Sequence, residues 1–368
     1  MARPLFFYSD EMLRYDLGDG HPMRPERLRM TYDLISSYGL FDSTLEVVAP
    51  ALADPEEVAQ THRGDYLDAI RKLSAGEHIG NAGRYGFGNG DNPIFPGMWE
   101  ASLRYTGGSV DAAQAILDGA GGGQVAFNIS GGLHHAHYGR AAGFCVLNDC
   151  AVAIRRLLRK YARVAYVDID VHHGDGVQEL FYEDPRVMTV SLHESGDTLF
   201  PGTGYTSEFG AGAGRGFSIN LPFAPYTGDR DWLWAWRASA LPLLKKFDPE
   251  AIVLQMGTDA HHLDPLAHLA LTAQGWLEAV KDVQALGRPI VAVGGGGYNL
   301  TTVPRMWTLA VATLAGVSLP DEVPASYTDQ ARIPTLTDHP EIQEDARTQY
   351  KTRAFAEESV AELQALAG

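Results

Sequence analysis

The stretch YVDIDVHHGDG, from Tyr166 to Gly176, places ionisable side chains where a buried strand should continue. The preceding run RVAYV is apolar, which predicts a strand buried on both faces of a parallel sheet. If that strand continues, Asp168, Asp170 and His172 point to one face. Three ionisable groups inside a sheet are costly unless they bind a cation or hydrogen-bond to one another. The stretch therefore predicts a metal site at a strand end; the alternative is a surface turn with solvated charges.

Further apolar runs of strand length alternate with segments of helical pattern. This alternation predicts one α/β domain with a single open, mostly parallel sheet and helices on both faces. The expected strands are residues 124–130, 163–171, 187–192, 251–257 and 289–297, and the expected helices include residues 147–162, 229–247 and 272–287.

Histidines, aspartates and a tyrosine follow these strands directly. His134 and His135 come after the first run, Asp259 after the fourth, and Tyr298 after four glycines at the end of the fifth. In an open parallel sheet, ligands bind at the carboxyl ends of the strands. We therefore expect these distant segments to meet in one pocket.

The length of 368 residues and the 45% hydrophobic content suit one large domain with an extensive core. We expect residues 1–368 to form a single domain, with its core at about residues 6–315. Residues 320–368 are expected to form a helical appendage, in which one helical face carries Phe355, Val360, Leu363 and Leu366.

The formal charge of -17 argues against binding to nucleic acid or to an anionic membrane surface, and it admits a cationic partner. No apolar run reaches the roughly 18 residues of a membrane span or forms a signal-peptide core. Cys145 and Cys150 are the only cysteines, which predicts reduced thiols rather than a disulfide framework. A cytoplasmic location is therefore expected, whereas the oligomeric state cannot be read from the sequence.

The ligand types narrow the choice of metal. Imidazole with carboxylates suits zinc, iron(II) or manganese. Asp170 and His172 supply two ligands, and a catalytic zinc needs a third. Asp259 is the best placed candidate, with His261 and His262 as the alternatives.

The pair formed by His134 and His135 suits proton transfer, because one ring can deprotonate water while the other holds a proton. Such rings need carboxylate partners, for which Asp168 and Asp175 are available. Tyr298 can donate a hydrogen bond to a developing oxyanion.

Together these motifs resemble the zinc-dependent histone deacetylase family, in particular its class I-like branch and the bacterial acetoin-utilization deacetylases. The resemblance runs through HPMRPERLRMTYDLI, GGLHHAHYGRAAGFCVLND, VAYVDIDVHHGDGVQELFY, VMTVSLHESGDTLFPGTG, QMGTDAHHLDPL and VGGGGYNL. It covers about residues 6–315 and implies an arginase/deacetylase-like fold with the active site at the carboxyl ends of the strands.

The resemblance implies roles for the matching residues. The zinc ligands are expected to be Asp170, His172 and Asp259. The catalytic group is expected to comprise His134, His135, Tyr298, Asp168 and Asp175, with His135 as the principal general base and acid. The acyl-lysine tunnel is expected to be lined by Gly143, Phe144, Phe200 and Leu266, with Asp91 gripping the substrate backbone at the rim and Arg27 lining an internal channel.

The resemblance also implies bound potassium. One ion is expected at Asp168, Asp170, His172, Ser191 and Leu192, and a second monovalent ion near Phe181, Asp184 and Val187. Cations on both sides would neutralise the two aspartates, which otherwise repel each other.

The implied function is hydrolysis of the acetyl amide of N6-acetyllysine in a protein or peptide, with Zn²⁺ or Fe²⁺ as the catalytic ion. Acetoin-utilization relatives point to an acetylated metabolic enzyme such as acetyl-CoA synthetase. The alternatives are an acetylpolyamine amidohydrolase, a binuclear manganese ureohydrolase and a non-catalytic acyl-ligand binding protein.

Overall fold

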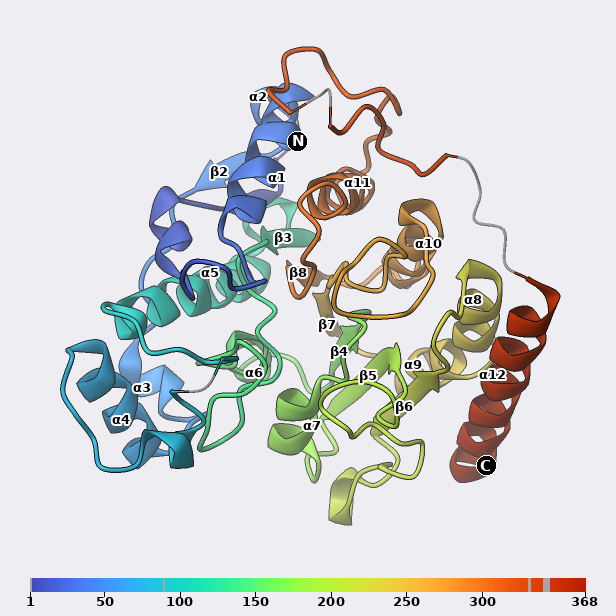
Figure 1. The fold of residues 1–368 in the computed structure, drawn as a ribbon, viewed down its shortest axis with the longest axis horizontal. Helices are drawn as coiled ribbons and strands as arrows, with labels where there is room; N and C mark the ends of the chain where they lie inside the picture. The colour runs from blue at the N-terminus through green and yellow to red at the C-terminus, as the bar shows by residue number, and fades with distance from the viewer. Residues whose placement is uncertain (1, 89, 330–331, 340–344) are drawn as a thin grey trace.

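A single open sheet organises the computed structural model, which describes residues 2–88, 90–329, 332–339 and 345–368 (Figure 1). Within these residues the sheet has eight strands in the order β2-β1-β3-β8-β7-β4-β5-β6, and all neighbouring strands are parallel. The strands are β1 (Leu5–Phe7), β2 (Glu46–Val48), β3 (Val125–Asn128), β4 (Val164–Asp168), β5 (Val187–Glu194), β6 (Ser218–Phe223), β7 (Ala251–Gln255) and β8 (Ile290–Val293). The predicted mostly parallel sheet is confirmed.

Helices cover both faces of the sheet, as the sequence predicts. In β4, Val164 and Tyr166 face one apolar cluster, and Ala165 and Val167 face another, because side chains alternate along a strand. The first cluster involves α5 (Met98–Asp118), α6 (Asp149–Leu157) and α7 (Asp175–Phe181). The second involves α1 (Glu26–Ser37), α8 (Asp229–Ala238), α9 (Ala240–Phe247), α10 (Ala273–Gln284), α11 (Val303–Leu314) and α12 (Ala346–Ala367). The remaining helices are α2 (Leu40–Ser43), α3 (Pro55–Val58) and α4 (Gly64–Ser74).

The strand order places the functional motifs side by side. β7 and β8 lie between β3 and β4, so the four strands followed by the histidine, aspartate and tyrosine motifs are consecutive in the sheet. Because these strands are parallel, their carboxyl ends share one edge. The loops after β3, β4, β7 and β8 therefore meet there.

Two predicted elements end earlier than expected. The strand expected over residues 163–171 ends at Asp168, but the alternation continues beyond it, because Ile169 and Val171 join the same apolar cluster as Ala165 and Val167. The helical stretch expected over residues 229–247 is interrupted at Ser239. Pro242 explains the second break, because its ring clashes with the carbonyl four residues earlier, at Ala238, where α8 ends.

The C-terminal segment packs on the sheet edge. α12 contacts β6 and α8 and runs along the side of the molecule, coloured red in Figure 1. Val360 and Leu363 are buried as expected, whereas Leu366 is exposed and Phe355 is only partly buried. The buried face is completed by small side chains, which the apolar pattern did not reveal: Thr352, Ala356 and Ser359.

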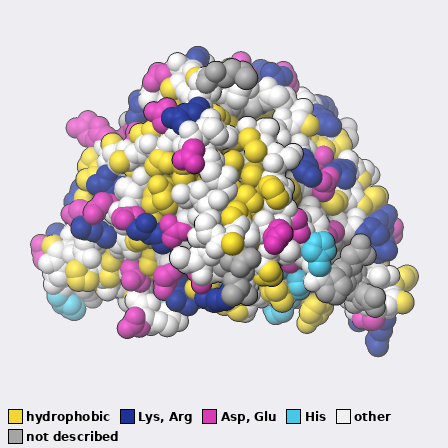
Figure 2. Space-filling model, turned by 90° about the horizontal axis from the view of Figure 1, so that it is seen from above, with side chains coloured by type: hydrophobic (Ala, Val, Ile, Leu, Met, Phe, Trp, Pro, Cys, Tyr) yellow, Lys and Arg dark blue, Asp and Glu magenta, His cyan; other side chains and the backbone are white. Residues whose placement is uncertain are grey.

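The surface seen in Figure 2 carries acidic and basic side chains interspersed with apolar ones. Cys145 and Cys150 are both buried free thiols, which confirms the predicted absence of a disulfide between them. In the described part of the chain, no helix is both long and apolar enough to cross a bilayer.

Candidate active site

Asp170, His172 and Asp259 converge on one point at the edge of the sheet. The Nδ1 atom of His172 lies 3.1 Å from Asp170 Oδ1 and 3.1 Å from Asp259 Oδ2. All three side chains are buried. One imidazole nitrogen and two carboxylate oxygens thus face a shared centre, as the sequence predicts.

Local hydrogen bonds direct these side chains beyond the end of β4. Asp168 Oδ1 accepts from the amide of Asp170 at 3.1 Å, and Asp170 Oδ1 accepts from the amide of His172 at 3.0 Å. An aspartate that accepts from the amide two residues later forms an Asx turn. Two successive turns of this kind orient the carboxylates, while the Ile169 amide and the Val171 carbonyl still bond to β7 and β5.

The second oxygen of each metal-facing carboxylate is fixed by other strand ends. Asp170 Oδ2 accepts from the Gly296 amide at 2.7 Å and from Gln255 Nε2 at 2.8 Å. Asp259 Oδ1 accepts from the Val171 amide at 2.9 Å. Each carboxylate therefore keeps one oxygen directed at His172.

The glycine run after β8 permits this close approach. A Cβ atom on Gly296 would lie 2.0 Å from Asp259 Oδ2 and 2.9 Å from Asp170 Oδ2. A side chain at this position would displace both carboxylates. The run GGGG therefore brings backbone against the carboxylates, and it is not a phosphate-binding loop.

The donor set fits a divalent cation. Burial and the negative charge of Asp170 raise the pKa of Asp259 to about 6, so the two carboxylates repel each other at close range. A cation between them would relieve that repulsion. Within the described residues, Asp170, His172 and Asp259 form the one group of three or more such side chains able to hold a metal ion.

His134 and His135 lie beside this centre, each against its own carboxylate. His134 Nδ1 is 2.7 Å from Asp168 Oδ2, and His135 Nδ1 is 2.7 Å from Asp175 Oδ1. The two Nε2 atoms are 3.0 Å apart. Each histidine thus has one of the two carboxylates that the sequence offers as partners.

The two rings differ in basicity. Burial and the charge of His134 lower the pKa of His135 to about 4, which keeps His135 neutral. Burial also opposes charge on His134, but Asp168 and Asp170 outweigh it and raise its pKa to about 9. One ring can therefore accept a proton while its neighbour holds one.

A narrow cavity of about 200 Å³ leads to the metal-facing residues. His135, His172 and Tyr298 line it together with all the residues that the sequence predicts for the tunnel. Leu199, which the sequence did not indicate, lines it as well. The predicted tunnel residues that line it are Asp91, Gly143, Phe144, Phe200 and Leu266.

Tyr298 and Phe144 line this cavity with rings at a steep angle, 5.7 Å between centroids. The Tyr298 amide donates to Asp264 Oδ2 at 2.8 Å, and burial raises the pKa of the Tyr298 hydroxyl well above its usual value. The phenol therefore stays a hydrogen-bond donor. Phe144 has a positive φ of 69°, and the Tyr15 hydroxyl donates to its carbonyl at 2.7 Å.

The alternative third ligands, His261 and His262, lie elsewhere. His261 Nε2 is 3.0 Å from Asp338 Oδ2 in the C-terminal segment. His262 Nδ1 is 3.2 Å from the Leu271 carbonyl. Neither joins the metal-facing group, so Asp259 is the geometrically available third ligand.

The residues expected around the first potassium ion lie together. Asp168 on β4 is the register partner of Ser191 on β5, and Leu192 follows Ser191 on the same strand. At the second expected site, the Asp184 carboxylate pairs with Arg186, and its backbone bonds to Phe181 and Val187. Both potassium assignments stay predictions.

Arg27 is buried behind the glycine run. Its Nη1 donates to the carbonyls of Gly295 and Gly297 at 2.7 and 3.1 Å. It also borders a separate cavity of about 20 Å³. The expected internal channel stays a prediction, while the contacts assign Arg27 a structural role in holding the loop of Tyr298.

Sequence reasoning missed several buried residues that position the site. Asp149 accepts from the amides of Gly132 and Leu133, at 3.0 and 2.8 Å, and so holds the turn before His134. Gln255 and Asp264 fix Asp170 and Tyr298. The available signal was weak: each is a polar residue beside an apolar run, and its partner is remote in sequence.

Sequence comparisons identify known proteins that are similar to this chain. A sequence profile for the histone deacetylase domain matches residues 21–314. The acetoin utilization protein AcuC of Bacillus subtilis (strain 168) is 41% identical over 335 residues, which cover 89% of this chain and 86% of AcuC. Human histone deacetylase 1 is 38% identical over 322 residues, which cover 87% of this chain and 66% of the human protein.

A solved structure shares the fold. It is the crystal structure of a histone deacetylase homologue in complex with SAHA, with a TM-score of 0.87 and 30% sequence identity. The match covers 98% of this chain and all of that chain.

Proposed function

Because this chain belongs to the histone deacetylase family, we propose that it hydrolyses the acetyl amide of N6-acetyllysine in proteins or peptides. The products are acetate and lysine. One observation carries the proposal: His135, His172 and Tyr298 line one cavity with Phe144 and Phe200, and His172 belongs to the metal-facing triad.

Asp170, His172 and Asp259 would hold the catalytic ion, Zn²⁺ or Fe²⁺, because both suit one imidazole and two carboxylates. When bound, such an ion supplies Lewis-acid polarisation of the amide carbonyl and makes water easier to deprotonate. We extend the proposal to potassium at Asp168, Asp170, His172, Ser191 and Leu192. A monovalent ion near Phe181, Asp184 and Val187 is a further part of it.

His135 is the proton acceptor in this proposal. Its ring is neutral, lies in the cavity and is oriented by Asp175. It takes a proton from the attacking water as the C–O bond forms. It returns that proton to the amide nitrogen as the C–N bond breaks. His134, paired with Asp168, lies against the His135 ring and supports its orientation.

Tyr298 and the aromatic walls orient the substrate. The Tyr298 hydroxyl donates a hydrogen bond to the acetyl oxygen, and loss of such a donor typically costs about 2.7 to 4 kcal/mol of barrier. Phe144 and Phe200 enclose the alkyl chain of lysine, and Asp91 at the mouth accepts from the substrate backbone. Together these groups exclude water from the departing amine.

The natural substrate is proposed from the likeness to AcuC. It is an acetylated metabolic enzyme, such as acetyl-CoA synthetase. Acetylpolyamines are the rival substrate, because the chemistry is the same. A binuclear manganese ureohydrolase would need additional acidic ligands beside Asp259. A non-catalytic acyl-binding protein would need no proton-transferring histidines.

Turnover of an acetyllysine peptide and of acetylspermidine, followed by acetate release, tests the proposal. We expect faster turnover of the peptide by the metal-loaded enzyme, and inhibition by a hydroxamate chelator. His135→Ala should lower kcat by about 10²–10⁴-fold, because it removes the general base. Its metal content should stay that of the wild type. Preferential turnover of acetylspermidine, or near wild-type turnover by His135→Ala, would contradict the proposal.

A further inference from the structure

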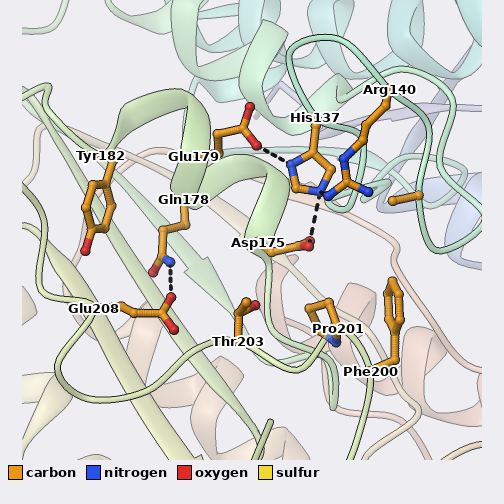
Figure 3. Close-up of a pocket in the computed structure, with 11 residues that line it drawn as sticks. His137, Arg140, Asp175, Gln178, Glu179, Tyr182, Phe200, Pro201, Thr203 and Glu208 are labelled. Atoms are coloured by element: carbon orange, nitrogen blue, oxygen red, sulfur yellow. Dashed lines mark hydrogen bonds and ion pairs between the residues drawn. The ribbon is translucent and has the colours of Figure 1, made fainter. Parts of the chain in front are cut away.

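A second cavity, of about 480 Å³, lies against the active site (Figure 3). Phe200 lines both cavities, so one wall of the proposed acyl-lysine tunnel is also a wall of this cavity. Asp175, the partner of His135, lines the second cavity too. The groups there that contact Asp175 can therefore influence the proposed base without contacting the substrate.

A chain of side-chain contacts runs from His135 through this cavity to the surface. Asp175 Oδ1 accepts from His135, and Asp175 Oδ2 lies 3.2 Å from His137 Nε2. His137 Nδ1 contacts Glu179 Oε2, and both contacts of His137 are drawn in Figure 3. The Glu179 side chain is 48% exposed, whereas that of His137 is 8% exposed. His137 thus bridges a buried carboxylate and a surface one.

The charge of the His137 ring favours this bridge. Burial opposes a charged ring, but the hydrogen bonds to Asp175 and Glu179 raise the pKa of His137 to about 9. A protonated ring donates from both nitrogens, one to each carboxylate. Arg140 Nη2 lies 2.8 Å from His137 Nε2 and is a second cation in the cavity. Because the charged ring carries a hydrogen on Nε2, this nitrogen donates to Asp175 and accepts no hydrogen bond from Arg140.

The stoichiometry of the reaction decides what the bridge can do. Hydrolysis of an acetyl amide with water yields acetate and a lysine ammonium ion near neutral pH, so no net proton is released or taken up. A path for protons from His135 to the solvent is therefore not required. The remaining role of the chain is to fix Asp175, whose own rotation would otherwise let the His135 ring turn.

On this basis, and resting on the proposed function, we propose that His137 is a positioning residue. It binds the second oxygen of Asp175, and so holds His135 in the orientation and tautomer that proton transfer requires. Glu179 in turn fixes the His137 ring. His137 acts through Asp175 and does not touch the substrate.

Two substitutions of His137 test this role in the full-length metal-loaded enzyme. His137→Phe keeps a flat ring but removes both donors, and it should lower kcat by about 10-fold, as loss of an outer partner of a catalytic group does. KM should change by less than about 2-fold, because the tunnel walls are intact. His137→Gln can still donate to Asp175 and should recover at least half of wild-type kcat.

Tyr182→Phe is the matched control. Tyr182 lines the same cavity on the side away from His137, as Figure 3 shows, and the substitution should leave kcat and KM unchanged. Wild-type kcat in His137→Phe would overturn the proposal, and so would equal losses in His137→Phe and His137→Gln. If His137→Phe does not fold, Glu179→Gln replaces it, with an expected fall in kcat of about 3-fold. Unchanged kcat in that variant would overturn the proposal.

A spectroscopic measurement separates this inference from the proposed function. The proton on His135 Nδ1 should resonate far downfield in protein labelled with ¹⁵N-histidine, because it is held between imidazole and carboxylate. His137→Phe should shift or broaden this signal, whereas Tyr182→Phe should not. No turnover of acetyllysine by the wild type would refute the proposed function, and the resonance would still decide the role of His137. An unchanged resonance in His137→Phe would overturn that role.

Discussion

Two histidine pairs follow parallel strands in this chain, and their surroundings differ. His134 and His135 come after β3, and His261 and His262 come after β7. The ring centroids are 4.0 Å apart in the first pair and 4.3 Å apart in the second. The first pair faces carboxylates beside the metal-facing group, whereas His261 faces Asp338 in the C-terminal segment.

The difference shows that the dipeptide does not decide its own role. The partners of His134 and His135 come from β4 and the start of α7, 34 and 40 residues away. The partner of His261 is 77 residues away and also accepts from Arg305 and the Ala273 amide. One pair thus orders a site for chemistry. The other fastens the C-terminal segment to the loop after β7.

The largest expected effect concerns the third metal-facing residue. Asp259→Ala should reduce bound metal from about one ion per chain to less than about one tenth, because the two remaining ligands bind a divalent ion much more weakly than three do. Turnover should fall to background. Metal analysis by mass spectrometry checks this, with His261→Ala as the matched variant that keeps its metal. Retained metal in Asp259→Ala would show that Asp259 is not a ligand. Loss of metal in His261→Ala would show that His261 is one.

A smaller effect is expected on stability. His261→Ala should lower the free energy of unfolding by about 1–3 kcal/mol, because the buried Asp338 carboxylate loses a hydrogen-bond partner. Urea denaturation of the metal-loaded protein measures the change. His262→Ala is the control, since His262 is only partly buried and bonds to one carbonyl, so its loss should be smaller. Equal losses in the two variants would contradict the anchoring role of His261.

An effect of similar size, seen only as the pH changes, is expected at His62. Buried His62 bonds through Nδ1 to the His137 carbonyl at 2.9 Å and accepts from the Asn148 amide at 2.9 Å, which fixes the loop of the first histidine pair. Burial lowers its pKa from 6.5 to about 4. The unfolded chain therefore binds the proton more readily. The contribution of His62 is complete above its unfolded pKa and is lost as the pH falls from about 6.5 towards 4.

Between pH 7 and pH 5 this linkage amounts to about 2 kcal/mol of unfolding free energy. The glutamine of His62→Gln does not titrate. From pH 7 to pH 5, the free energy of unfolding of this variant should therefore fall by about 2 kcal/mol less than that of the wild type. Urea denaturation at the two pH values measures the change in unfolding free energy for the variant and for the wild type. Equal changes in the two proteins would show that His62 is not held neutral in the folded protein.

The sequence predicted the site best where ionisable residues directly follow an apolar run that forms a strand. Asp170, His172 and Asp259 were identified because a buried apolar run cannot continue into charged side chains without a compensating partner. The tunnel residues Phe144 and Phe200 came only from the resemblance, since nothing in their spacing brings two aromatic rings to one cavity. The positioning residues, such as Asp149 and Asp264, gave only a weak signal because their partners are backbone amides of other segments.

By itself, the sequence determined the parallel α/β architecture and which residue types stand at the carboxyl ends of the strands. These properties depend on local apolar pattern, and on the cost of burying a charge. Tertiary structure alone decided the strand order, which sets β3, β8, β7 and β4 side by side. It also decided that His261 meets Asp338 in the C-terminal segment. Hydrogen bonds between residues tens of positions apart exist only after the sheet has brought them together, and a linear pattern of residues carries no distance between them.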